Sequence, residues 1–223
     1  MAVPTASRFS GPRVLFVMLV ILLLAVIPSV FLPTFACRED RKLDDLGAVP
    51  AFSFVDETGQ VFTEEALRGH PTIVNFIFTR CDTVCPITTM KMQRLEDKSR
   101  DKRGLAIKLL SISVDPEHDQ PAQLAAFAAK YKADPERWRF VTGKPADIKA
   151  LTEGAFMSPM DREGNTSRGS PNIVHSGYFF LVDGALRIRG AYESNDVKRL
   201  DELLHDARYL GRTQRHGYKF GGG

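Results

Sequence analysis

The sequence predicts an α/β domain, a central mixed sheet flanked by helices, from three patterns. The stretches Thr72–Thr79 and Leu105–Val114 are almost continuously apolar and rich in branched side chains, as strands buried on both faces are. A polar helical stretch separates them, so the two strands are expected to run parallel through a right-handed crossover. A hairpin-like pair of strands and a closing helix follow near the end of the chain. This combination is typical of the α/β class.

The N-terminal segment has a different character from the rest of the chain. Arg13 and Arg38 are separated by 24 uncharged, mostly apolar residues, and roughly 20 such residues suffice for a helix to cross a bilayer. A cleaved signal peptide is the alternative, although its apolar region is usually only about 7–15 residues long. Cys37 leaves open whether the segment is cleaved and lipidated. We expect a tail (1–13), an uncleaved transmembrane anchor (14–37) and a polar linker (38–50).

The remaining elements can be placed in order along the domain. Glu57-Thr58-Gly59 and Asp183-Gly184 are turn signals, each between two strand-like runs. Pro86 suits the first turn of a helix, and residues 157–172 have the composition of a loop. This order of elements is that of a thioredoxin-like domain, expected over 51–210 with a flexible tail at 211–223. We predict strands at 51–55, 60–62, 72–79, 105–114, 138–141, 177–182 and 185–189, and helices at 86–102, 120–132, 145–156 and 195–210.

Composition and charge exclude several functional classes. Of 223 residues, 43% are hydrophobic, so a packed core is expected and wholesale disorder is not. All 27 acidic residues and 28 of the 30 basic ones lie after residue 37, so the body carries a net charge of only 28 − 27 = +1. No basic surface for nucleic acid is therefore expected. Three cysteines are too few for a fold held together by disulfides.

Two cysteines, Cys81 and Cys85, carry the chemistry, because they lie where a central strand ends and a helix begins. A helix N-terminus favours the thiolate, and Arg80 adds a positive charge. Pro86 disfavours helical conformation at Cys85, so residues 81–85 are expected to form a loop with both sulfurs turned inward. A structural disulfide, or two small buried side chains, would be the simpler interpretation. The three-residue spacing differs from that of the usual thioredoxin motif, which weakens a plain oxidoreductase assignment.

A metal site needs a further ligand, and His175 is the best placed histidine. It lies just before the hairpin strand, and in thioredoxin-like folds the loop entering that strand packs against the cysteine motif. Two thiolates and one imidazole form a soft donor set that favours Cu(I), whereas zinc would need a fourth ligand and Cu(II) an additional donor. The other histidines are less suited by their position: His70, His118, His205 and His216.

These residues resemble the Sco/SenC family, whose members help to assemble the copper centre of cytochrome c oxidase. The resemblance extends over residues 48–192, although Val174 stands where the family commonly has an acidic residue, the 157–172 loop has no family pattern, and Cys37 is extra. It is carried by Phe52-x-Phe54-x-Asp56, Phe78-Thr79-x-Cys81-x-x-x-Cys85-Pro86, Ser113-Val114-Asp115-Pro116-x-x-Asp119, Trp138-x-x-x-Thr142-Gly143 and His175-Ser176.

The resemblance implies copper bound by Cys81, Cys85 and His175, with Asp115 and Asp119 supporting the site. It also implies a thioredoxin fold anchored in the bacterial inner membrane, with the domain on the periplasmic side. The copper acceptor would be subunit II of cytochrome c oxidase, whose cysteines the protein would load or reduce. A thiol reductant or an upstream copper donor would complete the set of partners.

The hypothesis is therefore a membrane-anchored copper chaperone whose cysteine pair cycles between dithiol and disulfide. One alternative is a thiol–disulfide oxidoreductase or redox-signalling protein that needs Cys81 and Cys85 but neither His175 nor copper. Another is a tethered interaction domain with an incidental disulfide.

Overall fold

The computed structural model describes residues 15–16, 18–22, 42–81, 84–100, 107–158, 161–165, 171–174 and 177–215. The chain divides into two compact units, residues 1–42 and 43–223. In the first unit, residues 15–16 and 18–22 are helical, and the rest of the predicted anchor lies outside the described residues. Among the residues described, no helix combines the length and the hydropathy needed to cross a membrane.

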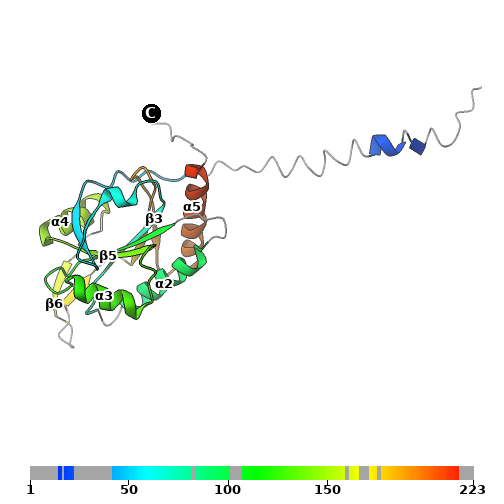
Figure 1. The fold of residues 1–223 in the computed structure, drawn as a ribbon. Coiled ribbons are helices and arrows are strands. Elements are labelled where there is room, and N and C mark those ends of the chain that lie inside the picture. The colour runs from blue at the N-terminus through cyan, green and yellow to red at the C-terminus, as the bar shows by residue number, and fades with distance from the viewer. Residues whose placement is uncertain are drawn as a thin grey trace, which may run out of the picture. The chain divides into compact units, whose positions relative to one another are not determined.

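The second unit is built on a seven-stranded mixed sheet (Figure 1). Its order is β2 (Val61–Thr63), β1 (Ser53–Asp56), β5 (Trp138–Thr142), β4 (Lys108–Ser113), β3 (Thr72–Ile77), β8 (Tyr178–Val182) and β9 (Ile188–Glu193). The pairs β3–β4 and β4–β5 are parallel, whereas β8 runs antiparallel to β3. The predicted parallel pairing of the two long strands is thus confirmed. Both predicted hairpins, β1–β2 and β8–β9, also form.

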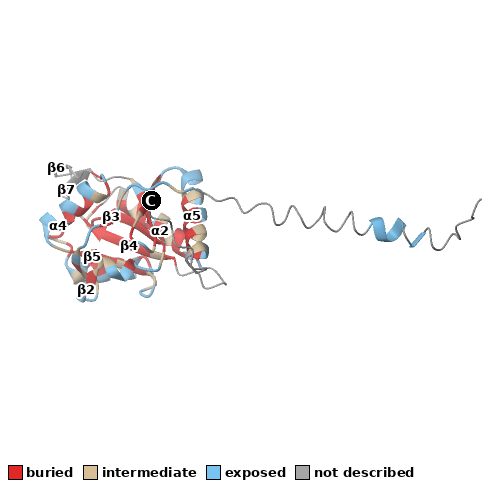
Figure 2. Cartoon of the chain, turned by 90° about the horizontal axis from the view of Figure 1, so that it is seen from above, coloured by how far each residue is buried: buried red, intermediate tan, exposed pale blue. Residues whose placement is uncertain are grey.

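Helices cover both faces of this sheet, and Figure 2 shows β3 and β4 buried between them. One apolar cluster joins the sheet to α2 (Val84–Lys98), α3 (Pro121–Lys130) and α5 (Val197–Arg215). A second cluster joins the opposite face to η1 (Glu64–Leu67), α4 (Pro145–Lys149) and η2 (Ala150–Ala155). All six residues of β3 are buried, as expected for a strand covered on both sides.

Two glycines fit places that a side chain would disturb. Gly59, in the β1–β2 turn, has a φ of +82°, which is in the region that glycine adopts most readily. Gly143 follows β5 and packs against the ring of Phe54, where an added Cβ would lie 2.5 Å from a ring carbon. The Trp138-x-x-x-Thr142-Gly143 pattern therefore ends β5 with a residue small enough to admit Phe54.

Several elements differ from the sequence-based predictions. The strand predicted at 185–189 is observed as β9 at Ile188–Glu193, and the helix predicted to end at 102 ends at Lys98. The helix predicted to begin at Pro86 begins at Val84, so Cys85 is helical, because a proline fits the first turn, where amides have no intrahelical acceptor. In the predicted 157–172 loop and just after it, β6 (Asp161–Asn165) pairs with β7 (Pro171–Val174), because backbone hydrogen bonds can form a hairpin without an alternating apolar pattern. The last helix continues to Arg215.

Candidate functional site

The cysteine pair lies where the sequence places it, between the end of β3 and the first turn of α2. Cys81 is 9% exposed and Cys85 is fully buried, and both form a small cluster with Phe78 against Val114. The backbone N–H of Cys85 donates to Sγ of Cys81 at 3.3 Å, so the first sulfur accepts a hydrogen bond from the helix N-terminus. Both cysteines are buried, as predicted, but the predicted 81–85 loop is wrong at its end, because Cys85 already belongs to α2.

The protonation of Cys85 differs from the simple expectation for a thiol at a helix N-terminus. Its hydrogen bond with Cys81, its burial and the negative charges of Cys81 and Asp119 raise the pKa of the Cys85 thiol well above its ordinary value. The helix N-terminus does not dominate, because Cys85 lies inside the first turn and faces a second sulfur in a buried space. The two thiols therefore do not both ionise easily unless a cation joins them.

Residues of the loop after β4 form hydrogen bonds with the residues that precede the cysteines. Asp119, a fully buried carboxylate, accepts hydrogen bonds from the backbone N–H of Thr79 at 2.9 Å and from its hydroxyl at 2.5 Å. The hydroxyl of Ser113 donates to the same carboxylate at 2.6 Å. Ser113 Oγ in turn accepts the N–H of Asp115 at 3.1 Å. We call residues 78–81 the cysteine turn and residues 115–119 the Asp115 loop. These hydrogen bonds join the cysteine turn and the Asp115 loop in one buried polar network.

An ion pair runs beside this network. Arg80, the residue directly before Cys81, contacts Oδ2 of Asp115 through Nη2 at 2.6 Å and through Nε at 3.1 Å. The side chain of Asp115 is fully buried, whereas that of Arg80 is 38% exposed. The pair therefore lies at the edge of the buried site, with its positive partner facing solvent.

The structure does not test the predicted third ligand, because His175 lies outside the described residues, as does His216. His70 precedes β3 and is thus at the opposite end of that strand from the cysteines. His118 donates its backbone N–H to Asp115 at 3.0 Å, and His205 is exposed on α5. Within the described ranges, no group of three or more Cys, His, Asp and Glu side chains could hold a metal ion.

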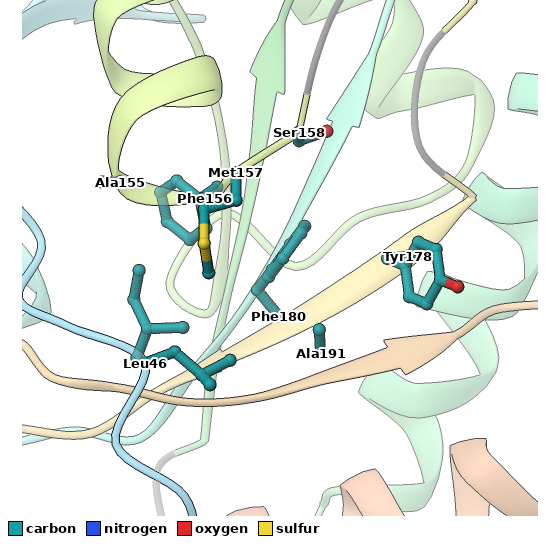
Figure 3. A pocket seen from close by; sticks show the side chains of 9 residues that line it. Leu46, Ala155, Phe156, Met157, Ser158, Tyr178, Phe180 and Ala191 are labelled. Atoms are coloured by element: carbon teal, nitrogen blue, oxygen red, sulfur yellow. The ribbon is translucent and has the colours of Figure 1, made fainter.

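An apolar pocket of about 310 Å³ lies on the opposite face of the sheet from α2. Figure 3 shows Phe156, Met157 and Phe180 around it, with Tyr178 at one side. Because β8 is antiparallel to β3, Tyr178 at the start of β8 lies at the same edge of the sheet as the cysteine turn. No sequence pattern predicted this pocket, because its lining comes from segments far apart in the chain.

Sequence reasoning assigned roles at the site to Asp115 and Asp119 only through the family resemblance, and it missed those of Thr79 and Ser113. Both lie within the quoted motifs, yet a hydroxyl at a strand end is common and carries no specific signal. Their roles follow from the register in which Ile77 lies opposite Ser113, since this places both loops at one edge of the sheet.

Comparison with known families identifies the chain. A profile of the SCO1/SenC family matches residues 41–208, which is more than half of the chain. The chain belongs to the SCO1/SenC family. The predicted resemblance is thus confirmed.

Individual relatives agree with this assignment. A SCO1 protein homolog of Bacillus subtilis is 29% identical over 181 residues, covering 80% of this chain and 91% of the relative. A protein of Stutzerimonas stutzeri named for copper binding is 30% identical over 193 residues, covering 79% of this chain and 91% of the relative.

Solved structures share the fold. A SCO1/SenC family lipoprotein of Bacillus anthracis superposes with a TM-score of 0.65 at 29% identity, over 78% of this chain and 99% of that one. BsSco is a member of the Sco family of cytochrome c oxidase assembly proteins and has a disulfide switch. It superposes with a TM-score of 0.65 at 28% identity, over 76% of this chain and 97% of that one. Copper-bound ScoI of Arabidopsis thaliana superposes with a TM-score of 0.62 at 25% identity, over 73% of this chain and 99% of that one. The predicted mixed α/β architecture with flanking helices is confirmed.

Proposed function

We propose that this SCO1/SenC protein is a copper chaperone for cytochrome c oxidase assembly, with Cys81, Cys85 and His175 as its copper ligands. The observation that carries the proposal is the buried pair of cysteines held together at the start of α2. Copper binding by relatives and the role of Sco proteins in oxidase assembly support it. The acceptor we propose is subunit II of the oxidase.

The donor set fits copper on chemical grounds. Two thiolates are soft ligands that select Cu(I). A bound cation would counteract the hydrogen bond with Cys81, the burial and the negative charge that raise the pKa of the Cys85 thiol. The copper-loaded state would therefore be the state in which both thiols are deprotonated.

The same pair supports a redox cycle. When the dithiol reduces a disulfide of the copper acceptor, an S–S bond forms between Cys81 and Cys85, the S–S bond of the acceptor breaks, and two electrons and two protons pass to the acceptor sulfurs. A thiol reductant then restores the dithiol by the same kind of exchange. The disulfide has no thiolate to offer copper, so oxidation would switch binding off. The disulfide switch of BsSco supports this cycle.

We further propose that residues 14–37 anchor the chain in the bacterial inner membrane and that the domain (51–210) faces the periplasm. The length of the uncharged N-terminal run supports the anchor. The lipoprotein relative from Bacillus anthracis supports a membrane-associated placement, by anchor or by lipid.

The test is a measurement of bound copper per chain. The purified 223-residue chain is reduced, loaded with Cu(I), freed of excess metal and analysed for copper, beside Cys81→Ser/Cys85→Ser and His175→Ala variants. About one copper per parent chain is expected, with loss of copper in both variants, because each removes at least one ligand. His205→Ala is the matched histidine control, since His205 is exposed on α5, and it should retain copper.

The outcomes separate the proposal from its rival. Copper loss in the cysteine variant alone would remove His175 from the ligand set. Absence of copper from the parent chain would overturn the chaperone assignment and favour a thiol–disulfide oxidoreductase. In that case, disulfide exchange with a small thiol would persist in the His175→Ala variant.

A further inference from the structure

Arg80 occupies the position between two differently anchored residues. On its N-terminal side, Thr79 is fixed to Asp119 by two hydrogen bonds, of 2.9 and 2.5 Å. On its C-terminal side, the backbone N–H of Cys81 returns to the carbonyl of Phe78 at 3.2 Å. The backbone therefore turns sharply at Arg80, immediately before the first sulfur.

The side chain of Arg80 ties this turn to the neighbouring loop. Nε and Nη2 both donate to Oδ2 of Asp115, at 3.1 and 2.6 Å. Such charge-assisted bonds to a fully buried carboxylate are stronger than ordinary surface ion pairs. Together with the Thr79–Asp119 bonds, they connect two consecutive residues before Cys81 to the two ends of the segment 115–119.

Charge reinforces this geometry. Asp115 and Asp119 place two buried carboxylates in the loop that contacts the residues before Cys81. A guanidinium at Arg80 supplies positive charge at this edge. Lysine would keep the charge but could not make two contacts through separate nitrogens of a planar group.

We propose that Arg80 is a positioning residue for the cysteine turn, which it holds against the Asp115 loop in the geometry that binds copper. The copper part of this inference rests on the proposed function, whereas the holding of the turn does not. Loss of the ion pair opens the turn locally and leaves the sheet intact, because the contacts of Arg80 lie at the edge of the sheet and not within it.

The test combines amide hydrogen exchange of the reduced, copper-free chain with Cu(I) affinity by competition against a chelator. Arg80→Gln is expected to lower the protection of the Cys81 and Cys85 amides about tenfold and to weaken Cu(I) binding by about the same factor. The β3 amides should keep their protection. For Arg80→Lys, both the amide protection and the Cu(I) affinity should lie between those of Arg80→Gln and the parent chain, because lysine keeps the charge but loses the paired contacts.

A matched control is Arg68→Gln, which removes a surface ion pair of the same 2.6 Å length, between two exposed side chains. It should change neither readout. The proposal is overturned if Arg80→Gln leaves the exchange of Cys81 and Cys85 unchanged, or if the β3 amides lose protection equally. An opened turn with unchanged Cu(I) affinity would also overturn it. If the parent chain binds no Cu(I), the proposed function fails, and the exchange data alone decide whether Arg80 holds the turn.

Discussion

Two buried aspartates, Asp119 beside the cysteines and Asp56 in the β1–β2 hairpin, organise their surroundings in different ways. Oδ1 of Asp56 accepts three hydrogen bonds from residues two and four positions away, Thr58 and Gln60, and its other oxygen pairs with Arg139. Asp119 uses both oxygens, and its partner Thr79 is 40 positions away. The hydrogen bonds of Asp56 to Thr58 and Gln60 build a local turn, although its pairing with Arg139 spans 83 positions. Asp119 instead joins two loops that are distant in sequence.

Buried aspartates that accept several hydrogen bonds therefore have two roles in this chain, shaping a turn and joining two loops. A local network such as that of Asp56 determines where a hairpin turns, and an error there remains confined to the edge of the sheet. A non-local network such as that of Asp119 determines how two loops meet, and in this chain one of those loops carries the cysteines. Loss of either aspartate should cost stability, but only the loss of Asp119 should alter the site.

The largest effect is expected from Asp119→Asn. The amide offers one acceptor oxygen in place of two, so at least one buried donor loses its partner, and the cost in unfolding free energy is about 3 kcal/mol. Cu(I) affinity should fall about tenfold because the cysteine turn loses its anchor. Urea unfolding and chelator competition measure the two quantities.

Asp56→Asn is the comparison, since its amide oxygen can still accept the turn hydrogen bonds while the pairing with Arg139 weakens. About 2 kcal/mol of unfolding free energy should be lost with no change in Cu(I) affinity. A fall in affinity equal to that of Asp119→Asn would show that copper binding follows overall stability, and the distinction between the two networks would be lost.

A smaller effect is expected when only the hydroxyls are removed. Thr79→Val deletes the 2.5 Å bond to Asp119 and keeps the backbone bond, which should cost about 1–2 kcal/mol and weaken Cu(I) binding several-fold. Thr58→Val deletes the equivalent 2.6 Å bond to Asp56 and should cost about 1 kcal/mol at unchanged affinity. Equal affinities for the two variants would contradict a specific role for Thr79.

The smallest effects concern pH. Burial raises the pKa of Asp56, but hydrogen bonds from Thr58 and Gln60 and the charge of Arg139 outweigh it, so the pKa lies below the ordinary 3.8. Its contribution to stability is present above pH 3.8 and is lost as the pH falls through the lowered value. Glu96, on α2, shows the reverse: burial raises its pKa above 4.5, more than the N–H of Asp134 and nearby arginines lower it. Its favourable contribution is lost as the pH rises through that raised value.

Urea unfolding between pH 3 and 7 distinguishes the two carboxylates. In Asp56→Asn, the unfolding free energy should fall less steeply than in the parent chain as the pH drops below 3.8. Glu96→Gln should stabilise the chain at pH 7 by up to about 1 kcal/mol relative to its effect at pH 4. A destabilised Glu96→Gln variant at pH 7 would show that the charged form of Glu96 is needed.

The arrangement of the elements was largely predictable from the sequence. Continuous apolar runs marked β3 and β4 because a strand buried on both faces needs no polar side chains, and the intervening helix implied their parallel pairing. The β6–β7 hairpin was not predictable, because β6 is polar and neither segment has the alternating pattern of a strand, so its pairing rests on backbone hydrogen bonds. The start of α2 was misplaced because the proline rule does not apply strictly within the first turn.

For the site, the sequence was enough to show which residues could carry the chemistry: two cysteines at the junction of a strand and a helix, and the motifs of the SCO1/SenC family. Residue type and spacing suffice for this, because each side chain supplies its own donor atoms. The folded arrangement was needed to show that Thr79 and Arg80 are held by Asp119 and Asp115, and that Cys85 is buried against Cys81. Such contacts depend on the register of β3 against β4, which brings together loops some 35–40 positions apart, and no local pattern encodes that register.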